Sequence, residues 1–228
     1  MYDNKHRLLP ITTRNTSPLK LLQKGIKEHL LCKYCEVKLS RWEPILKRSL
    51  VDIGNLESRS LDIEKIRENF IKVNGLSYKE IKLCLLSILW RMSISSNDFY
   101  SSYNLGPYEE KIRKHILEEN YVSELQYPIS ITRYELDGEF TSGIIAGFPP
   151  GRYTSIFTVQ QFIIWGHLFK FFVNDLKKPP ITPDVFLRET GQVYIDIQSL
   201  KDLVSSKSVV SRLFDKDVNY MFNKKMKW

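Results

Sequence analysis

The fold of this chain is decided by residues 77–92, which read SYKEIKLCLLSILWRM. Ser77 and Glu80 have the spacing of a capping box, which marks the start of a helix. The apolar residues that follow lie almost all the way round such a helix, and neighbouring elements must cover a helix of this kind on every side. The segment therefore predicts a central, buried helix.

Further helices are expected on both sides of this segment. They are expected to begin at Pro18, Cys35, Asp62 and Pro107. Pro44 limits or kinks the helix that begins at Cys35. The helix from Asp62 is expected to have an apolar face of Ile63, Ile66, Phe70 and Val73 and to end at Asn74 and Gly75. Residues 51–60 have the composition of a linker. The first half of the chain is thus expected to be helical.

From Tyr127 onwards the apolar period changes to two, which predicts β-strands, and Asp137-Gly138 is typical of a hairpin turn. Further strands are expected over residues 144–148, 153–159, 162–173 and 192–197. The run at 162–173 fits a buried helix equally well, because periodicity does not separate the two in a continuous apolar stretch. Residues 207–222 return to a helical pattern.

These patterns predict an α+β fold in one compact unit: a mainly helical region at 1–120, then an antiparallel sheet and a closing C-terminal helix at 121–228. The 228 residues are 43% hydrophobic, enough for a real core, and contain no apolar run of the roughly 18 residues that a membrane span needs. The first residues contain no signal-peptide core, and three cysteines do not make a disulfide framework. We therefore expect a cytoplasmic protein without a membrane partner.

Basic residues gather at the two ends of the chain. The formal charge is +8, and residues 1–50 contain 11 basic and 4 acidic side chains, while residues 201–228 contain 7 and 3. Such ends attract nucleic acid or an acidic protein, or form a solvated surface. The candidate contacts are Lys24, Lys27, Lys33 and Arg41 near the first end, and Lys224, Lys225, Lys227 and the apolar anchor Trp228 at the second.

Cys32 and Cys35 form the one motif with chemical content. Two thiolates at this spacing are half of a tetrahedral zinc site, and His29 is the nearest further donor, although all three on one turn give awkward geometry. A redox dithiol, which usually follows a strand in a βαβ unit, and ordinary free thiols near a helix start are the alternatives. No cofactor is required by the sequence, and zinc stays open. Cys84 is expected to pack inside its apolar helix.

A resemblance rests on residues 23–36, QKGIKEHLLCKYCE, continued by Ser40-Arg41-Trp42-Glu43 and by the later Leu89-Trp90-Arg91. This stretch resembles the second zinc knuckle and helix of a treble clef in a group of bacterial and phage proteins related to His-Asn-His endonucleases. The resemblance covers roughly residues 23–117. It implies a degenerate zinc-knuckle remnant within the helical region and a role in phage defence or counter-defence.

The departures from that family concern catalysis. No cysteine and no Ser-His-x-x-Pro element precede Cys32, and Glu36 stands where an active nuclease has a metal-binding histidine. A single carboxylate without a partnered general base does not assemble metal-assisted hydrolysis. We therefore expect a non-catalytic binding or accessory protein that docks on nucleic acid or on an acidic protein partner. The alternative is a divergent metal-dependent nuclease, and the oligomeric state stays open.

Two further groups of residues have two interpretations each. Arg91 lies in a helix with little polar surface, and since a buried unpaired charge is very costly, an ion pair with Glu36 or Glu43 is expected in preference to phosphate binding. Tyr100, Tyr103 and Tyr108 suit either base stacking or the rim of the core.

Overall fold

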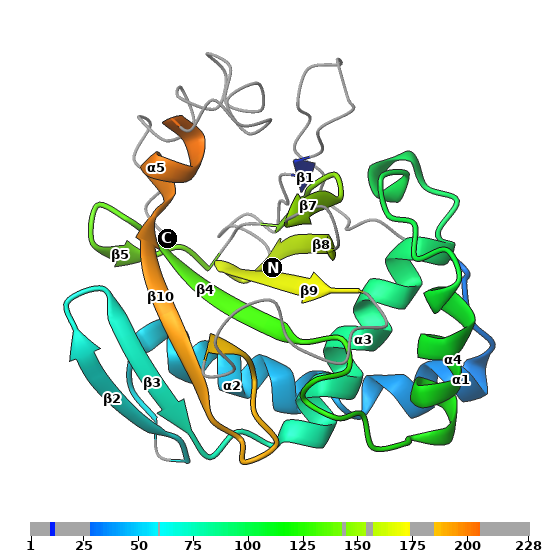
Figure 1. The fold of residues 1–228 in the computed structure, drawn as a ribbon, viewed down its shortest axis with the longest axis horizontal. Helices are drawn as coiled ribbons and strands as arrows, with labels where there is room; N and C mark the ends of the chain where they lie inside the picture. The colour runs from blue at the N-terminus through cyan, green and yellow to red at the C-terminus, as the bar shows by residue number, and fades with distance from the viewer. Residues whose placement is uncertain are drawn as a thin grey trace.

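The computed structural model describes residues 10–11, 28–58, 60–142, 145–153, 157–173 and 185–205. Over these residues the chain combines helices with a mixed sheet (Figure 1), which confirms the expected α+β class. The helices are α1 (Lys33–Ser40), α2 (Glu43–Asn55), α3 (Tyr78–Ile94), the short 3-10 helix η1 (Asp98–Tyr100), α4 (Tyr108–Glu118) and α5 (Leu200–Ser205). The expected helices at 18–26 and 207–222 lie outside the described residues.

The sheet contains ten strands within the described ranges. They are β1 (Pro10–Ile11), β2 (Asp62–Arg67), β3 (Phe70–Asn74), β4 (Ile129–Leu136), β5 (Glu139–Phe140), β6 (Ile145–Gly147), β7 (Gly151–Tyr153), β8 (Phe157–Ile164), β9 (His167–Phe172) and β10 (Val193–Ser199). Their order is β1-β6-β8-β9-β4-β10-β3-β2, with β5 beside β4 and β7 beside β8. The sheet is mixed and not purely antiparallel, because β10 runs parallel to β4 and β1 runs parallel to β6.

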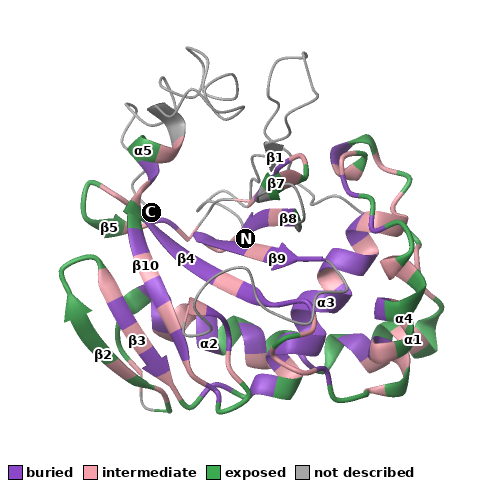
Figure 2. Cartoon of the chain, viewed as in Figure 1, coloured by how far each residue is buried: buried purple, intermediate pink, exposed green. Residues whose placement is uncertain are grey.

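Helix α3 is the central helix that its sequence predicts. It packs against α2 and α4, and its apolar side chains are buried along most of its length, as Figure 2 shows. Lys82 is also buried in α3, and its Nζ donates a hydrogen bond of 2.7 Å to the carbonyl oxygen of Tyr127. The hydrocarbon stem of this lysine thus belongs to the core, while its amine is satisfied by one backbone oxygen.

Pro44 divides the helix expected after Cys35 into two. Helix α1 ends at Ser40, and α2 begins at Glu43, so the proline occupies the first turn of α2, where its missing N–H costs no hydrogen bond. The linker expected at 51–60 is wrong in its first half, since α2 continues to Asn55. One face of α2 packs in the core through Leu46, Leu50 and Ile53. This packing stabilises the helix through residues 51–55, whose sequence alone suggests a linker.

The helix expected at 62–73 is wrong, because these residues form the hairpin β2–β3. The apolar residues fit two periods: Ile63, Ile66, Phe70 and Val73 have the spacing of a helix, whereas Ile71 and Val73 alternate as in a strand. The tertiary partner decides between them, since β3 pairs with β10 and buries Ile71 and Val73 while β2 stays mostly exposed. Local propensity is often overridden in this way.

The apolar run at 162–173 forms strands and not a helix. It divides between β8 and β9 at a turn formed by Trp165 and Gly166. Gly166 has a φ of +66°, and a Cβ at this position would lie 2.2 Å from the carbonyl oxygen of Thr141, so only glycine fits the turn. Of the strand expected at 153–159, residue 153 ends β7 and residues 157–159 begin β8, while residues 154–156 lie outside the described ranges.

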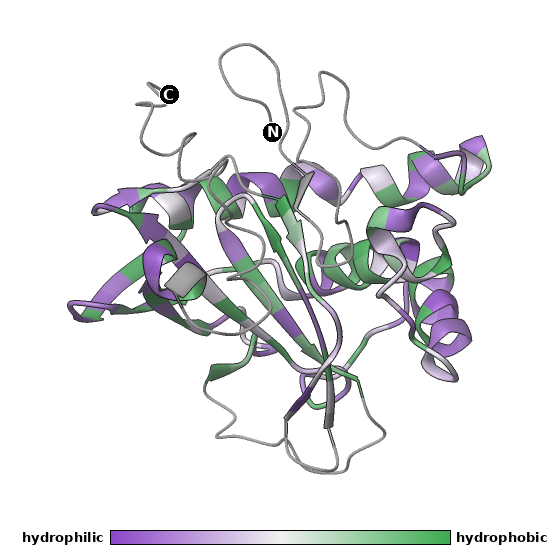
Figure 3. Cartoon of the chain, turned by 90° about the horizontal axis from the view of Figure 1, so that it is seen from above, coloured by the Kyte–Doolittle hydropathy of each residue, from purple (hydrophilic) through white to green (hydrophobic). Residues whose placement is uncertain are grey.

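One row of side chains runs across the middle of the sheet. Ile71, Ile195, Ile131 and Phe169 occupy matching positions on β3, β10, β4 and β9. All four are buried in the same core cluster as α2 and α3, and Figure 3 shows the hydrophobic residues along these strands. In the described part of the chain, no helix is long and apolar enough to cross a membrane.

Candidate functional site

The two cysteines of the C-x-x-C motif lie at the start of α1. Cys32 is the N-cap residue, with an extended backbone, and its Sγ accepts a hydrogen bond of 3.5 Å from the backbone N–H of Cys35. Cys32 is exposed and Cys35 is half-buried. The Cys35 N–H, followed by the Cys35 thiol, lowers the pKa of Cys32, whereas the hydrogen bond that the Cys35 thiol donates to the Cys32 sulfur, together with burial, raises the pKa of Cys35. The two thiols therefore differ in acidity.

The described residues do not complete a zinc site at these cysteines. Within this part of the chain, no group of three or more His, Cys, Asp or Glu side chains is placed so that it could hold a metal ion. Cys84 lies in the interior of α3 with no exposed surface, and burial raises the pKa of its thiol to about 12. Cys32 and Cys35 thus lie together without a third ligand among the described side chains, and Cys84 is a packing residue.

Arg91 forms its ion pair with Glu43. The guanidinium Nη2 lies 3.1 Å from Oε1 of Glu43, and Nε donates to the carbonyl oxygen of Ser87 at 3.3 Å. This pair joins the start of α2 to the last turn of α3. Glu36, the other expected partner, makes no ion pair with Arg91 but lines the same cavity as Arg91.

Two basic residues of the α1 region are held by one carboxylate. Lys38 lies 3.2 Å from Oε1 of Glu119, and Arg41 pairs with Oε2 of the same residue. Burial alone would raise the pKa of Glu119, but the hydrogen bonds from Lys38 and Arg41 hold it below its usual value. Arg41 is therefore engaged within the fold, whereas Lys33 is exposed beside Cys32.

The segment before α1 is fixed over the end of α3 by Glu28. Its Oε1 accepts hydrogen bonds from the backbone N–H of Ser96 at 2.9 Å and from the Ser96 hydroxyl at 2.6 Å, and its Oε2 accepts one from the Ser95 hydroxyl. The Ser95 hydroxyl, then Ser96, lower the pKa of Glu28, because each bond favours the carboxylate. Glu28 thus connects its own segment to two serines that lie 67 and 68 positions later in the sequence.

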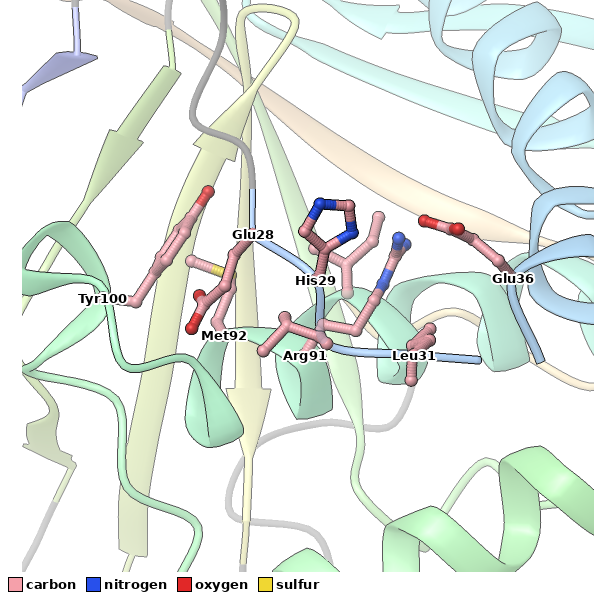
Figure 4. A pocket seen from close by; sticks show the side chains of 9 residues that line it. Glu28, His29, Leu31, Glu36, Arg91, Met92 and Tyr100 are labelled. Carbon is pink, nitrogen blue, oxygen red and sulfur yellow. The ribbon is translucent and has the colours of Figure 1, made fainter. Parts of the chain in front are cut away.

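A cavity of about 610 Å³ lies between this segment and α3 (Figure 4). It is lined by Glu28, His29, Leu30, Leu31, Glu36, Ile88, Arg91, Met92 and Tyr100. In the view of Figure 4, Tyr100 stands at one end and Glu36 at the other, with His29 and Arg91 between them. The lining combines an apolar wall with a few polar groups that come from four parts of the chain, which is the usual composition of a small-molecule or base-sized binding site.

The polar groups of this cavity include hydrogen-bond donors and acceptors that the described residues leave unused. Arg91 uses two of its five N–H groups in the bonds given above, and His29 is exposed and makes no hydrogen bond within the described ranges. The Glu36 carboxylate is likewise exposed. Burial raises the pKa of Tyr100, so its hydroxyl stays protonated at neutral pH. The cavity can therefore offer donors, acceptors and an aromatic ring to one ligand.

A second cavity of similar volume has the opposite character. It lies at the end of β4 and β10 and is lined by Asn69, Glu135, Asp137, Gly138, Asp196, Ile197, Gln198, Ser199 and Asp202. Glu135 pairs with the buried Arg133, Asp137 pairs with Lys201, and Asp196 accepts a hydrogen bond from Gln198. Four carboxylates around one hollow repel phosphate, so this end of the sheet is unsuited to a polyanion.

The basic excess of the chain falls outside the described residues. The described ranges contain 19 of the 34 basic side chains and 21 of the 26 acidic side chains. The rest of the sequence therefore contains 15 basic and 5 acidic side chains. The expected contacts Lys24, Lys27, Lys224, Lys225, Lys227 and Trp228 are among those remaining residues, and their structure is not described. The described part of the protein is thus close to neutral, and any charge-driven attraction to a polyanion depends on the remaining segments.

The sequence singles out Arg91, His29, Glu36 and Tyr100, but it links only Arg91 with Glu36, as one of two possible ion pairs, and does not predict a shared cavity. The contact that joins them is made by Glu28, which was given no role, and the cavity it closes lies between segments about 60 residues apart in the sequence. Tyr103, in contrast, belongs to the core rim: its buried hydroxyl donates to the Gln161 carbonyl at 2.8 Å and accepts from the Phe148 N–H at 3.2 Å.

Comparison with known proteins finds no match to a family model, to a curated protein or to a solved structure. The resemblance to His-Asn-His endonucleases therefore stays a prediction.

Proposed function

We propose that this chain is a non-catalytic binding protein for single-stranded nucleic acid, in which the cavity beside α3 takes an unpaired base and the basic segments contact phosphates. The observation that supports this proposal best is the composition of the cavity. Glu36 is an acceptor, Arg91 is a donor and Tyr100 provides an aromatic ring, all over an apolar wall. Base edges present donors and acceptors together, and base faces stack on aromatic rings.

The carboxylates in the cavity favour a base over a phosphate. Glu28 is satisfied by the two serines, but Glu36 is exposed and would repel a phosphate oxygen, whereas it would accept a hydrogen bond from the amino group of a base. A paired base cannot present its edge in this way. The proposal therefore predicts a preference for single strands over duplexes.

The sequence next to the cavity supports the placement of phosphates. Residues 12–27, which lead directly to Glu28, contain Arg14, Lys20, Lys24 and Lys27 and no acidic residue. A strand with one base in the cavity would thus pass close to the start of a basic segment, whose charges attract phosphates without regard to sequence. The setting of a phage or bacterial conflict system is a further proposal, which follows from the family resemblance alone.

The salt dependence of binding tests the basic segments. Each phosphate that the protein neutralises releases counterions, so log affinity for a single strand should fall against log salt with a slope of about −0.7 per contact. Lys24→Gln with Lys27→Gln should weaken binding and flatten this slope by up to about 1.4. A triple Lys→Gln variant at Lys224, Lys225 and Lys227 should act in the same direction. The measurement is fluorescence anisotropy of a labelled oligonucleotide at several salt concentrations.

The matched control for charge is Lys65→Gln with Arg67→Gln. Both residues are exposed on β2, which Figure 1 shows at the other side of the molecule from α1. This variant should retain the affinity and slope of the unaltered chain. If no oligonucleotide binds even at low salt while a polyglutamate peptide does, the nucleic-acid proposal is wrong and an acidic protein partner, with Trp228 as a candidate anchor, takes its place. Cleavage of the oligonucleotide with Mg²⁺ or Mn²⁺ would contradict the non-catalytic role.

The cavity is tested by variants that leave the charge pattern of the segments unchanged. Tyr100→Leu and His29→Ala should each weaken single-strand binding by about 1–3 kcal/mol, the usual contribution of one stacked base, with little change in salt slope. Tyr34→Leu is the matched control, because Tyr34 is an exposed tyrosine that does not line the cavity. If all three variants bind as tightly as the unaltered chain, the cavity does not take part in binding.

A further inference from the structure

The pair Cys32 and Cys35 has the local geometry of a reactive dithiol. Cys32 is the N-cap residue of α1, Cys35 lies in the first turn of the same helix, and the two thiols are hydrogen-bonded to each other. The Cys32 Sγ already accepts the Cys35 N–H at 3.5 Å, so its side chain is turned towards the first turn of α1. Little rearrangement is needed to join the two sulfurs.

The surroundings of the pair assign different roles to the two thiols. Cys32 is exposed at the N-terminus of an eight-residue helix, where the backbone N–H groups stabilise a thiolate, and it is accessible to a small molecule. Cys35 is half-buried one turn further on, and its thiol is hydrogen-bonded to Cys32. The lowered pKa of Cys32 and the raised pKa of Cys35, given above, agree with this division.

We propose that Cys32 and Cys35 form a dithiol–disulfide exchange site for low-molecular-weight disulfides such as oxidised glutathione. The Cys32 thiolate attacks one sulfur of the small disulfide, the S–S bond breaks, and the leaving thiolate takes up the proton that Cys32 released. The Cys35 thiolate then attacks the Cys32 sulfur, and the second small thiol leaves with the proton from Cys35. Two thiols of the chain are thereby oxidised to one disulfide, while the small disulfide is reduced to two thiols.

The exchange needs no nucleic acid and is measured without it. Its outcome is therefore independent of the binding function proposed above.

The experiment follows the reduced full chain by intact mass spectrometry after oxidised glutathione is added. The unaltered chain should pass through a transient single-glutathione adduct and then lose two hydrogen atoms. Cys35→Ser should accumulate the adduct on Cys32, and Cys32→Ser should react more slowly by roughly tenfold, because the more acidic thiol is removed. Cys84→Ala, at the buried third cysteine, should behave as the unaltered chain does.

Three results would overturn the proposal: a lasting adduct without ring closure in the unaltered chain, equal rates in the two serine variants, or purified protein containing one zinc ion per chain that protects both thiols. Both serine substitutions lie at or near the surface. Circular dichroism spectra that match those of the unaltered chain will separate a loss of reactivity from a loss of fold.

Discussion

Replacing Leu89 with alanine is expected to lower the free energy of unfolding by about 2–5 kcal/mol. Leu89 has no exposed surface, and it belongs to the core cluster that α3 shares with α2, α4 and the sheet. The substitution removes three carbon atoms and leaves a cavity that close-packed neighbours fill only in part. Leu85, which is equally buried one turn earlier, should show a loss of the same size.

The control for this prediction is Leu125→Ala. Leu125 is 42% exposed, in the connection between α4 and β4, so its loss should change stability by no more than about 0.5 kcal/mol. Urea denaturation of the three variants and the unaltered chain gives the comparison. If Leu89→Ala loses no more stability than Leu125→Ala, α3 is peripheral and the architecture described above is wrong.

The second large effect is a pH dependence that comes from Lys82. Burial lowers the pKa of Lys82 to about 7 in the folded chain, against 10.5 for an ordinary lysine. Between these values the unfolded chain binds a proton that the folded chain does not, so stability should rise as the pH rises from 7 towards 10.5 and should be level below 7. Relative to Lys82→Met, the unaltered chain should gain about 3 kcal/mol between pH 7 and pH 9.5.

The comparison uses the difference in stability between the unaltered chain and Lys82→Met, so that the contributions of other titrating groups cancel. Lys79→Met, an exposed lysine on the same helix, should follow the unaltered chain at every pH. The measurement is urea denaturation at a series of pH values from 6.5 to 9.5. Parallel curves for Lys82→Met and the unaltered chain would mean that the Lys82 amine is solvated in the folded state, contrary to its hydrogen bond with Tyr127.

The parts of the fold that sequence predicts well are those that local chemistry determines. Ser77 is the N-cap of α3, although its side chain makes no capping hydrogen bond. Pro44 lies in the first turn of α2, and Asp137-Gly138 connects β4 to β5. The hairpin β2–β3 does not follow from the sequence, because Ile63, Ile66, Phe70 and Val73 also fit the spacing of a helix. The pairing of β3 with β10, more than a hundred residues later, decides between strand and helix, and no local pattern contains that information.

The candidate site was predictable only residue by residue. The position of Cys32 at a helix start follows from the sequence, and so does the need of Arg91 for an acidic partner. The cavity does not follow, since it exists only where Glu28 holds its segment against Ser95 and Ser96. Lys82 was also overlooked, because a lysine in an apolar helix is ordinarily expected to reach solvent.

The position of β10 has a consequence for how the polypeptide acquires its structure during synthesis. This strand lies between β4 and β3, so it joins the early hairpin to the rest of the sheet, yet it is the last strand of the described chain to leave the ribosome. Until residue 199 has emerged, the edge of β3 and the edge of β4 both lack their partner. Such late, long-range pairing slows folding and leaves strand edges open to other chains. A nascent chain of this topology should depend on chaperones that shield strand edges until the sheet closes around its final strand.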